Sequence, residues 1–137
     1  MKKKGFTLVE LLAVIAILAI LVIMALPAVL RMYRQARQNT FVEEVQGVYR
    51  QAQTQYVQDA ITSLTSTKTY TNCGTPTEEQ LLPMTTSKNF HYTVTIDNTG
   101  VSTLKASNGS YKYESSGVVS NPSDITATEA DNADICG

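Results

Sequence analysis

The feature that most constrains the fold of this chain is an uninterrupted apolar run near its N-terminus. Residues 11–30 carry no charged side chain and none that forms strong hydrogen bonds. Because a helix rises about 1.5 Å per residue, this run is long enough to cross the hydrocarbon core of a bilayer. Any fold of the chain must therefore place this helix in lipid or against other apolar helices.

A single carboxylate, Glu10, stands directly before this run, and Gly5 and three lysines precede it. A lone carboxylate in a membrane helix costs about 2 to 3 kcal/mol at the bilayer centre and less at an interface, so it needs a partner or a purpose. A secretory signal would require a small-residue cleavage site, and residues 23–25 fit that pattern poorly. A lipoprotein anchor is excluded because no cysteine stands near the run. A plain membrane anchor with a chance glutamate remains an alternative.

The stretch KKKGFTLVE, residues 2–10, resembles the class III leader of type IV pilins and pseudopilins. The resemblance covers about the first thirty residues. It implies a basic leader at residues 1–5, cleavage by a prepilin peptidase between Gly5 and Phe6, and N-methylation of Phe6. Glu10, one helical turn after Phe6, could offset the new α-amine of its own chain or of a neighbouring one. The resemblance implies that it does so between subunits, as its role in assembly.

Charges on both sides of the run bear on assembly and orientation. In a bundle of identical apolar helices an unpaired Glu10 would be costly and a paired one tolerated, so this residue would set the register between subunits. The positive-inside rule does not decide the orientation, because Arg31, Arg34 and Arg37 follow the run as closely as the lysines precede it. The resemblance implies a cytoplasmic leader and an exported C-terminal part.

The helix is predicted to continue beyond the membrane and filament-core segment, residues 6–30, as an amphipathic helix over residues 31–61. Pro27 removes a backbone donor and predicts a kink, and the resemblance implies that residues 18–27 lose helical regularity in an assembled filament. Apolar side chains then recur every three or four positions and predict a buried face: Phe41, Val45, Val48, Ala52, Tyr56 and Ala60.

The remaining chain predicts a loop, a sheet and a tail. Residues 62–88 are rich in Ser, Thr, Asn, Gly and Pro and predict an exposed loop, with a short helical turn at residues 77–82. Residues 89–120 predict an antiparallel sheet, with Asn108–Gly109 as a hairpin turn rather than a glycosylation site. Its expected strands are residues 90–96, 101–106 and 111–115, with a short edge piece at residues 117–119. These segments predict an α+β fold of the type IV pilin kind, a long helix packed on a small antiparallel sheet.

The two cysteines, Cys73 and Cys136, show neither zinc-site spacing nor a CxxC motif. In an exported domain they are expected to pair, which would close the tail, residues 121–137, and stabilise the fold by ~4 kcal/mol. Two free thiols remain the alternative.

Other side chains suggest no cofactor and no catalysis. Four acidic residues of the tail are weak calcium candidates, with a solvated acidic loop preferred: Asp124, Glu129, Asp131 and Asp134. His91 has no second histidine or cysteine near it in the sequence and is expected at the surface. Tyr70, Tyr111 and Tyr113 are expected in the core or at its rim rather than as a sugar- or base-stacking surface. No catalytic constellation or phosphate-binding loop is present.

Net charge gives no support for nucleic-acid binding, because 12 acidic residues outnumber 11 basic ones and the leader removes three of the latter. The resemblance to type IV pilins implies the first functional hypothesis, a structural, non-enzymatic subunit of a type IV pilus-like filament for adhesion, motility or DNA uptake. Such a subunit would be a single-pass membrane protein before assembly and part of an extracellular filament afterwards. Its partners would be the prepilin peptidase, the inner-membrane assembly machinery and copies of itself. The alternatives are a pseudopilin of a secretion or competence system and a membrane-anchored binding domain that never polymerises.

Overall fold

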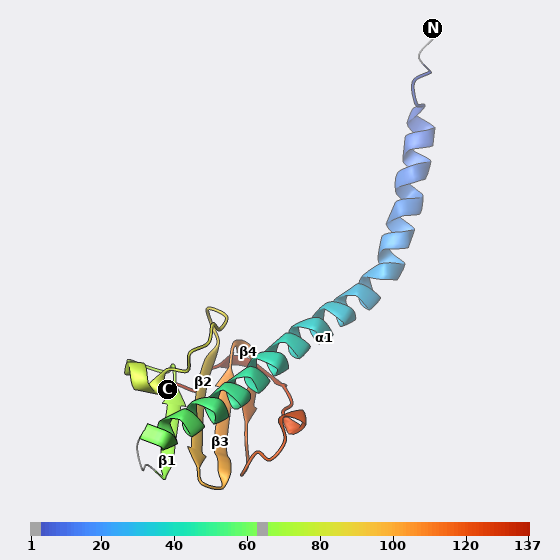
Figure 1. Ribbon diagram of the computed structural model, residues 1–137. Helices are drawn as coiled ribbons and strands as arrows, with labels where there is room; N and C mark the ends of the chain where they lie inside the picture. Colours follow the sequence, from blue (N-terminus) through green and yellow to red (C-terminus); the bar gives the residue numbers. More distant parts are fainter. Residues whose placement is uncertain (1–3, 63–65) are drawn as a thin grey trace. The chain divides into compact units, whose positions relative to one another are not determined.

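The computed structural model describes residues 4–62 and 66–137. The chain divides into two compact units, Met1–Arg37 and Gln38–Gly137. The described residues form one long helix, five strands and two short 3₁₀ helices (Figure 1): α1 (Leu8–Thr62), β1 (Thr67–Thr71), η1 (Glu78–Gln80), β2 (His91–Asp97), β3 (Gly100–Ser107), β4 (Gly109–Glu114), η2 (Pro122–Asp124) and β5 (Thr128–Ala133).

The N-terminal unit consists of the first part of α1 and the short segment before it. Every side chain of residues 4–40 is exposed. The helix continues through Pro27 without a break, so residues 18–27 are helical in the single chain. The loss of regularity that the resemblance implies for a filament, and the kink at Pro27, remain predictions.

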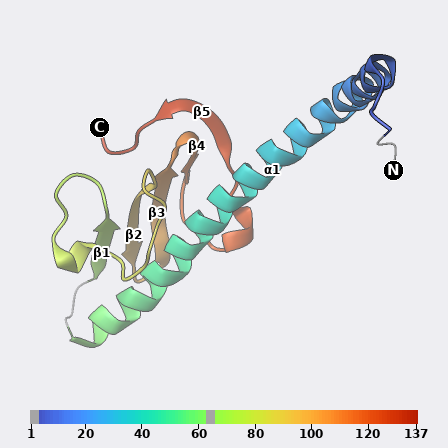
Figure 2. The ribbon, with the colours of Figure 1, turned by 90° about the horizontal axis from the view of Figure 1, so that it is seen from above.

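The second part of α1 lies across one face of the sheet (Figure 2). Phe41 is fully buried, and its ring lies 5.9 Å from Phe90 and 6.0 Å from Tyr111, measured between centroids. The predicted face is largely confirmed, although Ala60 is exposed and Tyr49 also belongs to the core. The buried residues of the helix are Phe41, Val45, Val48, Tyr49 and Ala52.

The five strands form one antiparallel sheet in the order β1-β2-β3-β4-β5. Strand β2 alternates strictly between half-buried and buried residues, as its sequence predicts, and it directs Tyr92, Val94 and Ile96 into the core. Tyr70 and Tyr111 are buried as well and Tyr113 is half-buried, so the expectation that these tyrosines belong to the core or its rim is confirmed.

Two edge strands lie where a loop and a tail were predicted. Strand β1 falls within residues 62–88 and β5 within residues 121–137, so neither segment is purely a loop. Both strands are polar and have few inward-facing apolar side chains, and backbone pairing with a neighbouring strand holds them in the sheet. The predicted helical turn is confirmed as η1, where the Thr77 N–H donates to Gln80 Oε1 at 3.1 Å.

The turn between β3 and β4 and the segment after β4 agree more closely with the predictions from the sequence. Asn108 and Gly109 form the predicted hairpin turn, with Gly109 at φ +84° and Asn108 Oδ1 accepting from the N–H of Tyr111 at 2.9 Å. The short edge piece predicted at residues 117–119 is not a strand; there Val119 forms only an isolated bridge with Val101. The backbone carbonyl of Val119 also accepts a hydrogen bond from the Tyr49 hydroxyl, which ties this segment to α1.

Candidate processing and assembly site

The start of α1 is built by two residues of the FTLVE stretch. The Thr7 N–H donates to Glu10 Oε2 at 3.0 Å, and the Glu10 N–H donates to Thr7 Oγ1 at 3.3 Å. This reciprocal pair is a capping box, in which each side chain satisfies a backbone donor that the first helical turn leaves free. The sequence therefore places the Glu10 carboxylate at the helix N-terminus, where the helix dipole favours a negative charge.

The predicted cleavage site lies just outside this cap. Gly5 and Phe6 precede the first helical residue, and Phe6 is 87% exposed. Apart from its two neighbours in the chain, no described residue has an atom within 4 Å of the position that a Cβ on Gly5 would take. An exposed, non-helical peptide bond next to a capped helix is accessible to a peptidase.

The apolar part of α1 is uncovered in the single chain. Its large side chains are exposed on all sides of the helix, from 81% at Leu8 to 46% at Leu30. By length and composition, α1 can cross a membrane. A surface this apolar must be covered by lipid or by other apolar helices, since water would leave it strongly unfavourable.

A comparison with protein families bears directly on this site. The model of the prokaryotic N-terminal methylation motif matches residues 1–26. The chain carries the class III prepilin leader of type IV pilins. The match includes Gly5, Phe6 and Glu10 and ends within the apolar part of the helix. Searches of curated proteins and of solved structures found no match.

A disulfide closes the C-terminal tail of this pilin-like chain. Cys73 and Cys136 are bonded, with their Cα atoms 5.1 Å apart, which confirms the predicted pairing; the structure shows the oxidised state rather than two free thiols. Cys73 follows β1 and Cys136 follows β5, so the bond joins segments that leave the two opposite edges of the sheet. In Figure 1 the C-terminus accordingly lies beside β1.

His91 was predicted to be a surface residue, and the structure corrects this prediction. Its side chain is half-buried, and one ring nitrogen lies with the sulfur atoms of Cys73 and Cys136 in a group whose members are all within 4.8 Å of one another. The sequence spacing does not reveal this neighbourhood, because it depends on the pairing of β1 with β2 and on the path of the tail.

The calcium candidates do not gather in the same way. Asp124 lies in η2, Glu129 and Asp131 lie in β5, and Asp134 follows that strand. Among the residues that the structure describes, none of the four joins a group of three metal-binding side chains. Asp134 Oδ1 instead accepts a hydrogen bond of 2.8 Å from the Cys136 N–H. A calcium site in the tail therefore remains a prediction without a defined set of ligands.

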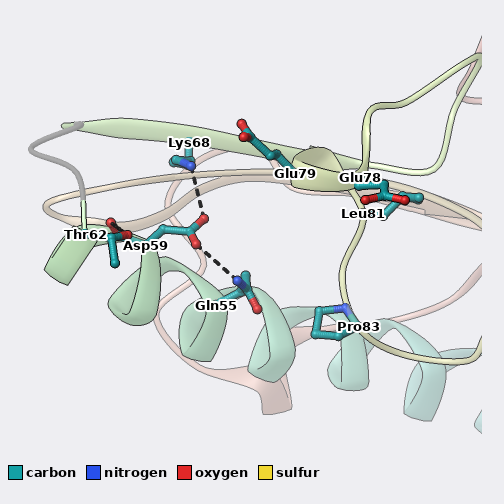
Figure 3. A pocket seen from close by; sticks show the side chains of 8 residues that line it. All are labelled: Gln55, Asp59, Thr62, Lys68, Glu78, Glu79, Leu81 and Pro83. Carbon is teal, nitrogen blue, oxygen red and sulfur yellow. Dashed lines mark hydrogen bonds and ion pairs between the residues drawn. The ribbon is translucent and has the colours of Figure 1, made fainter.

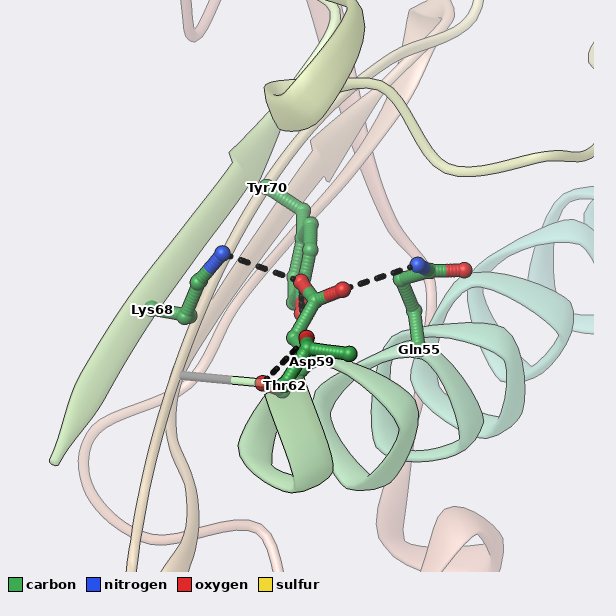
Figure 4. A network of polar contacts seen from close by, with 5 residues as sticks. All are labelled: Gln55, Asp59, Thr62, Lys68 and Tyr70. Atoms are coloured by element: carbon green, nitrogen blue, oxygen red, sulfur yellow. Dashed lines mark hydrogen bonds and ion pairs between the residues drawn. The ribbon is translucent and has the colours of Figure 1, made fainter. Parts of the chain in front are cut away.

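A polar network at the C-terminal end of α1 was not predicted (Figure 4). Asp59 Oδ2 accepts from the Tyr70 hydroxyl at 2.9 Å and pairs with Lys68 Nζ at 3.1 Å, while Asp59 Oδ1 accepts from Gln55 Nε2 at 3.1 Å. Burial favours a higher pKa for Asp59, but these hydrogen bonds outweigh it and hold its pKa below the usual value. Burial and the nearby carboxylate raise the pKa of Tyr70.

This network borders a pocket of about 490 Å³ between the end of α1 and the loop that carries η1 (Figure 3). Lys68 in its lining is already paired with Asp59, and Glu78 and Glu79 are exposed at its rim. The contacts of Asp59 join the last turns of α1 to β1, so we assign the network a structural role.

Proposed function

We propose that the chain is the structural subunit of a type IV pilus-like extracellular filament. The observation that carries this proposal is the combination of a matched prepilin leader with an apolar helix that the folded domain does not cover. The core of the second unit uses residues from Phe41 onward, so the apolar helix before it is free to serve membrane anchoring and assembly.

The maturation steps follow from the leader. Cleavage between Gly5 and Phe6 would remove the three lysines and leave the α-amine of Phe6, its predicted methylation site, close to the Glu10 carboxylate. In the membrane the precursor would hold its apolar helix in lipid. During assembly neighbouring helices would replace the lipid, and Glu10 would pair with an α-amine so that neither charge is buried alone.

Assembly of this kind uses one contact repeated between identical subunits. Such heterologous contacts do not close on themselves and produce an open helical filament. The proposed partners are the prepilin peptidase, the inner-membrane assembly machinery and other copies of the chain. The leader and helix would serve a pseudopilin equally well, so the filament type is the point that an experiment must decide.

The deciding experiment is electron microscopy of the sheared cell-surface fraction, combined with mass spectrometry of the chain. We expect long filaments that contain a chain beginning at methylated Phe6. A processed chain confined to the membrane would contradict the surface-filament role and favour a pseudopilin. An uncut N-terminus would contradict processing altogether.

A pair of variants separates assembly from folding. Glu10→Val is expected to abolish filaments while the processed protein stays in the membrane at wild-type amount. Glu43→Val, which removes an exposed carboxylate further along the same helix, is the matched control and should leave filaments unchanged. Unchanged filaments in Glu10→Val would argue against a role of this carboxylate in assembly.

A further inference from the structure

Three side chains with metal-binding atoms converge at one end of the sheet. The register that pairs Thr71 with Thr93 continues past the end of β1, because the Asn72 N–H donates to the carbonyl of Tyr92 at 3.2 Å. One further step brings Cys73 opposite His91. The tail after β5 then carries Cys136 to the same place, and the two sulfurs and one ring nitrogen lie within 4.8 Å of one another.

The surroundings of His91 supply a second, independent observation. Its Nδ1 atom is buried and has no hydrogen-bond partner among the described residues. Ser107 pairs with His91 across β2 and β3. Its buried hydroxyl likewise has no hydrogen-bond partner among the described residues. Paired residues share one face of a sheet, so two unsatisfied polar groups lie on the same face. Buried polar atoms seldom remain without partners, and a missing water or ion is a common reason.

We propose that the dithiol form of the chain, before Cys73 and Cys136 are oxidised, binds one Zn²⁺ through both thiolates and His91. Thiolate and imidazole are the usual ligands of zinc in proteins. With bonds of about 2.0 to 2.3 Å, tetrahedral zinc holds its ligand atoms about 3.3 to 3.8 Å apart. The two sulfurs are bonded to each other in the disulfide, so after reduction the two cysteine side chains must turn apart to this separation, while their Cα atoms start 5.1 Å apart.

The fourth coordination position belongs to solvent. A pocket of about 280 Å³ adjoins His91, and the side chains of Asn108, Asn132 and Asp134 contribute to its polar lining. A metal-binding histidine normally donates its second ring N–H to a neighbouring acceptor or to a water. The unpartnered Ser107 hydroxyl, across the strand pair from His91, could take this role through a bridging water.

Zinc binding and disulfide formation are alternative states of the same two sulfurs. On binding, each thiol releases its proton to solvent and Zn²⁺ takes the two thiolates. An oxidising disulfide then accepts two electrons by thiol–disulfide exchange and takes up two protons from solvent, becoming a dithiol. The bond between Cys73 and Cys136 forms in the same exchange, and Zn²⁺ is released. Zinc would thus hold the tail against the sheet until the covalent bond replaces it.

Metal titration of the full chain in detergent micelles tests this site. After reduction with a phosphine, the chain is expected to bind one Co²⁺ with thiolate-to-metal charge-transfer absorption and tetrahedral d–d bands, and Zn²⁺ should displace the Co²⁺. The oxidised chain should show neither signal. His91→Gln in the reduced chain is expected to weaken metal binding by at least about tenfold. The matched control is Thr95→Ala, on the same face of β2 but outside the cluster, and it should bind like the wild type.

A stability measurement covers the case in which the reduced chain loses its fold. Zn²⁺ at a hundredfold excess over its dissociation constant is expected to raise the Tm of the reduced chain by about 10 °C or more, and to leave the Tm of the oxidised chain unchanged. Absence of Co²⁺ binding, equal affinity in His91→Gln, or a reduced chain that stays unfolded with zinc present would each overturn the proposal.

Discussion

The hydroxyl of Tyr70 donates a 2.9 Å hydrogen bond to the carboxylate of Asp59. Tyr70 is fully buried in β1, and Asp59 lies in the last turns of α1, so the bond joins the end of the long helix to an edge strand. A buried hydroxyl that donates to an ionised carboxylate forms a stronger hydrogen bond than a neutral pair does. This contact therefore helps to hold an edge strand in which Tyr70 is the one fully buried side chain.

Tyr70→Phe removes this hydroxyl and keeps the ring. Because hydrogen bonds to charged groups contribute about 1.5 to 3 kcal/mol, we expect the Tm of the domain to fall by roughly 6 °C or more. Thermal unfolding of the full oxidised chain in micelles, followed by near-UV circular dichroism, measures the change. Tyr33→Phe is the matched control, since Tyr33 lies exposed on α1, and it should leave the Tm unchanged. Equal Tm values for the wild type and Tyr70→Phe would contradict the assigned role.

The same carboxylate predicts an acid dependence. The folded-state pKa of Asp59 is lowered, so its contribution is fully present above the unfolded-state pKa, which is about 4. The contribution is lost as the pH falls through the lower folded-state pKa. We therefore expect the wild type to lose more stability than Asp59→Asn between pH 5 and pH 3. In Tyr70→Phe the acid-dependent loss should be smaller than in the wild type. A parallel acid dependence of the wild type and Asp59→Asn would contradict this assignment.

The elements predicted from the sequence are those whose pattern reflects burial. The buried face of α1 and strand β2 show the spacings of 3.6 and 2 that an apolar core imposes, and both were found in place. Strands β1 and β5, with the sequences TKTYT and TEADNA, carry almost no such pattern. Their pairing rests on backbone hydrogen bonds to neighbouring strands, which composition does not encode.

The candidate sites also differ in whether the sequence could predict them. The leader and Glu10 could be found because their residues are adjacent in the chain and form a motif. The group of His91, Cys73 and Cys136 could not, because its members come from three separate segments. Their approach depends on the register of β1, a strand that the sequence itself did not predict.

The core predicts a contrast between two positions of α1. Phe41 is fully buried against Phe90 and Tyr111, so Phe41→Ala should leave a cavity and reduce the free energy of unfolding by about 3 to 5 kcal/mol. Val57 lies on the same helix but is 59% exposed, and Val57→Ala should change the free energy of unfolding by less than about 0.5 kcal/mol. Urea unfolding of the oxidised chain measures both. Similar effects of the two substitutions would mean that this face of α1 does not dock on the sheet.

The disulfide predicts a large loss on removal. Its two cysteines are 63 positions apart, and closing a loop of that length stabilises the folded state by ~4 kcal/mol in the chain-entropy model. The double variant Cys73→Ser, Cys136→Ser should lose about this amount relative to the oxidised wild type. The matched control is Ser116→Ala, which keeps the bond and changes an exposed residue. A double variant as stable as the oxidised wild type would show that the bond adds little to the fold.

The capping box at the start of α1 predicts that Thr7 positions the Glu10 carboxylate. Thr7→Val removes the oxygen that accepts from the Glu10 N–H, and loss of a cap of ~1 kcal/mol should speed amide exchange in the first helical turn about fivefold. Thr7→Ser keeps a hydroxyl at the same position and should exchange like the wild type. Hydrogen–deuterium exchange of the chain in micelles, read out by mass spectrometry, distinguishes the two variants. If the proposed assembly requires a held carboxylate, filament yield should fall in Thr7→Val and recover in Thr7→Ser. Faster exchange with unchanged filament yield would show that the cap stabilises the helix without contributing to assembly.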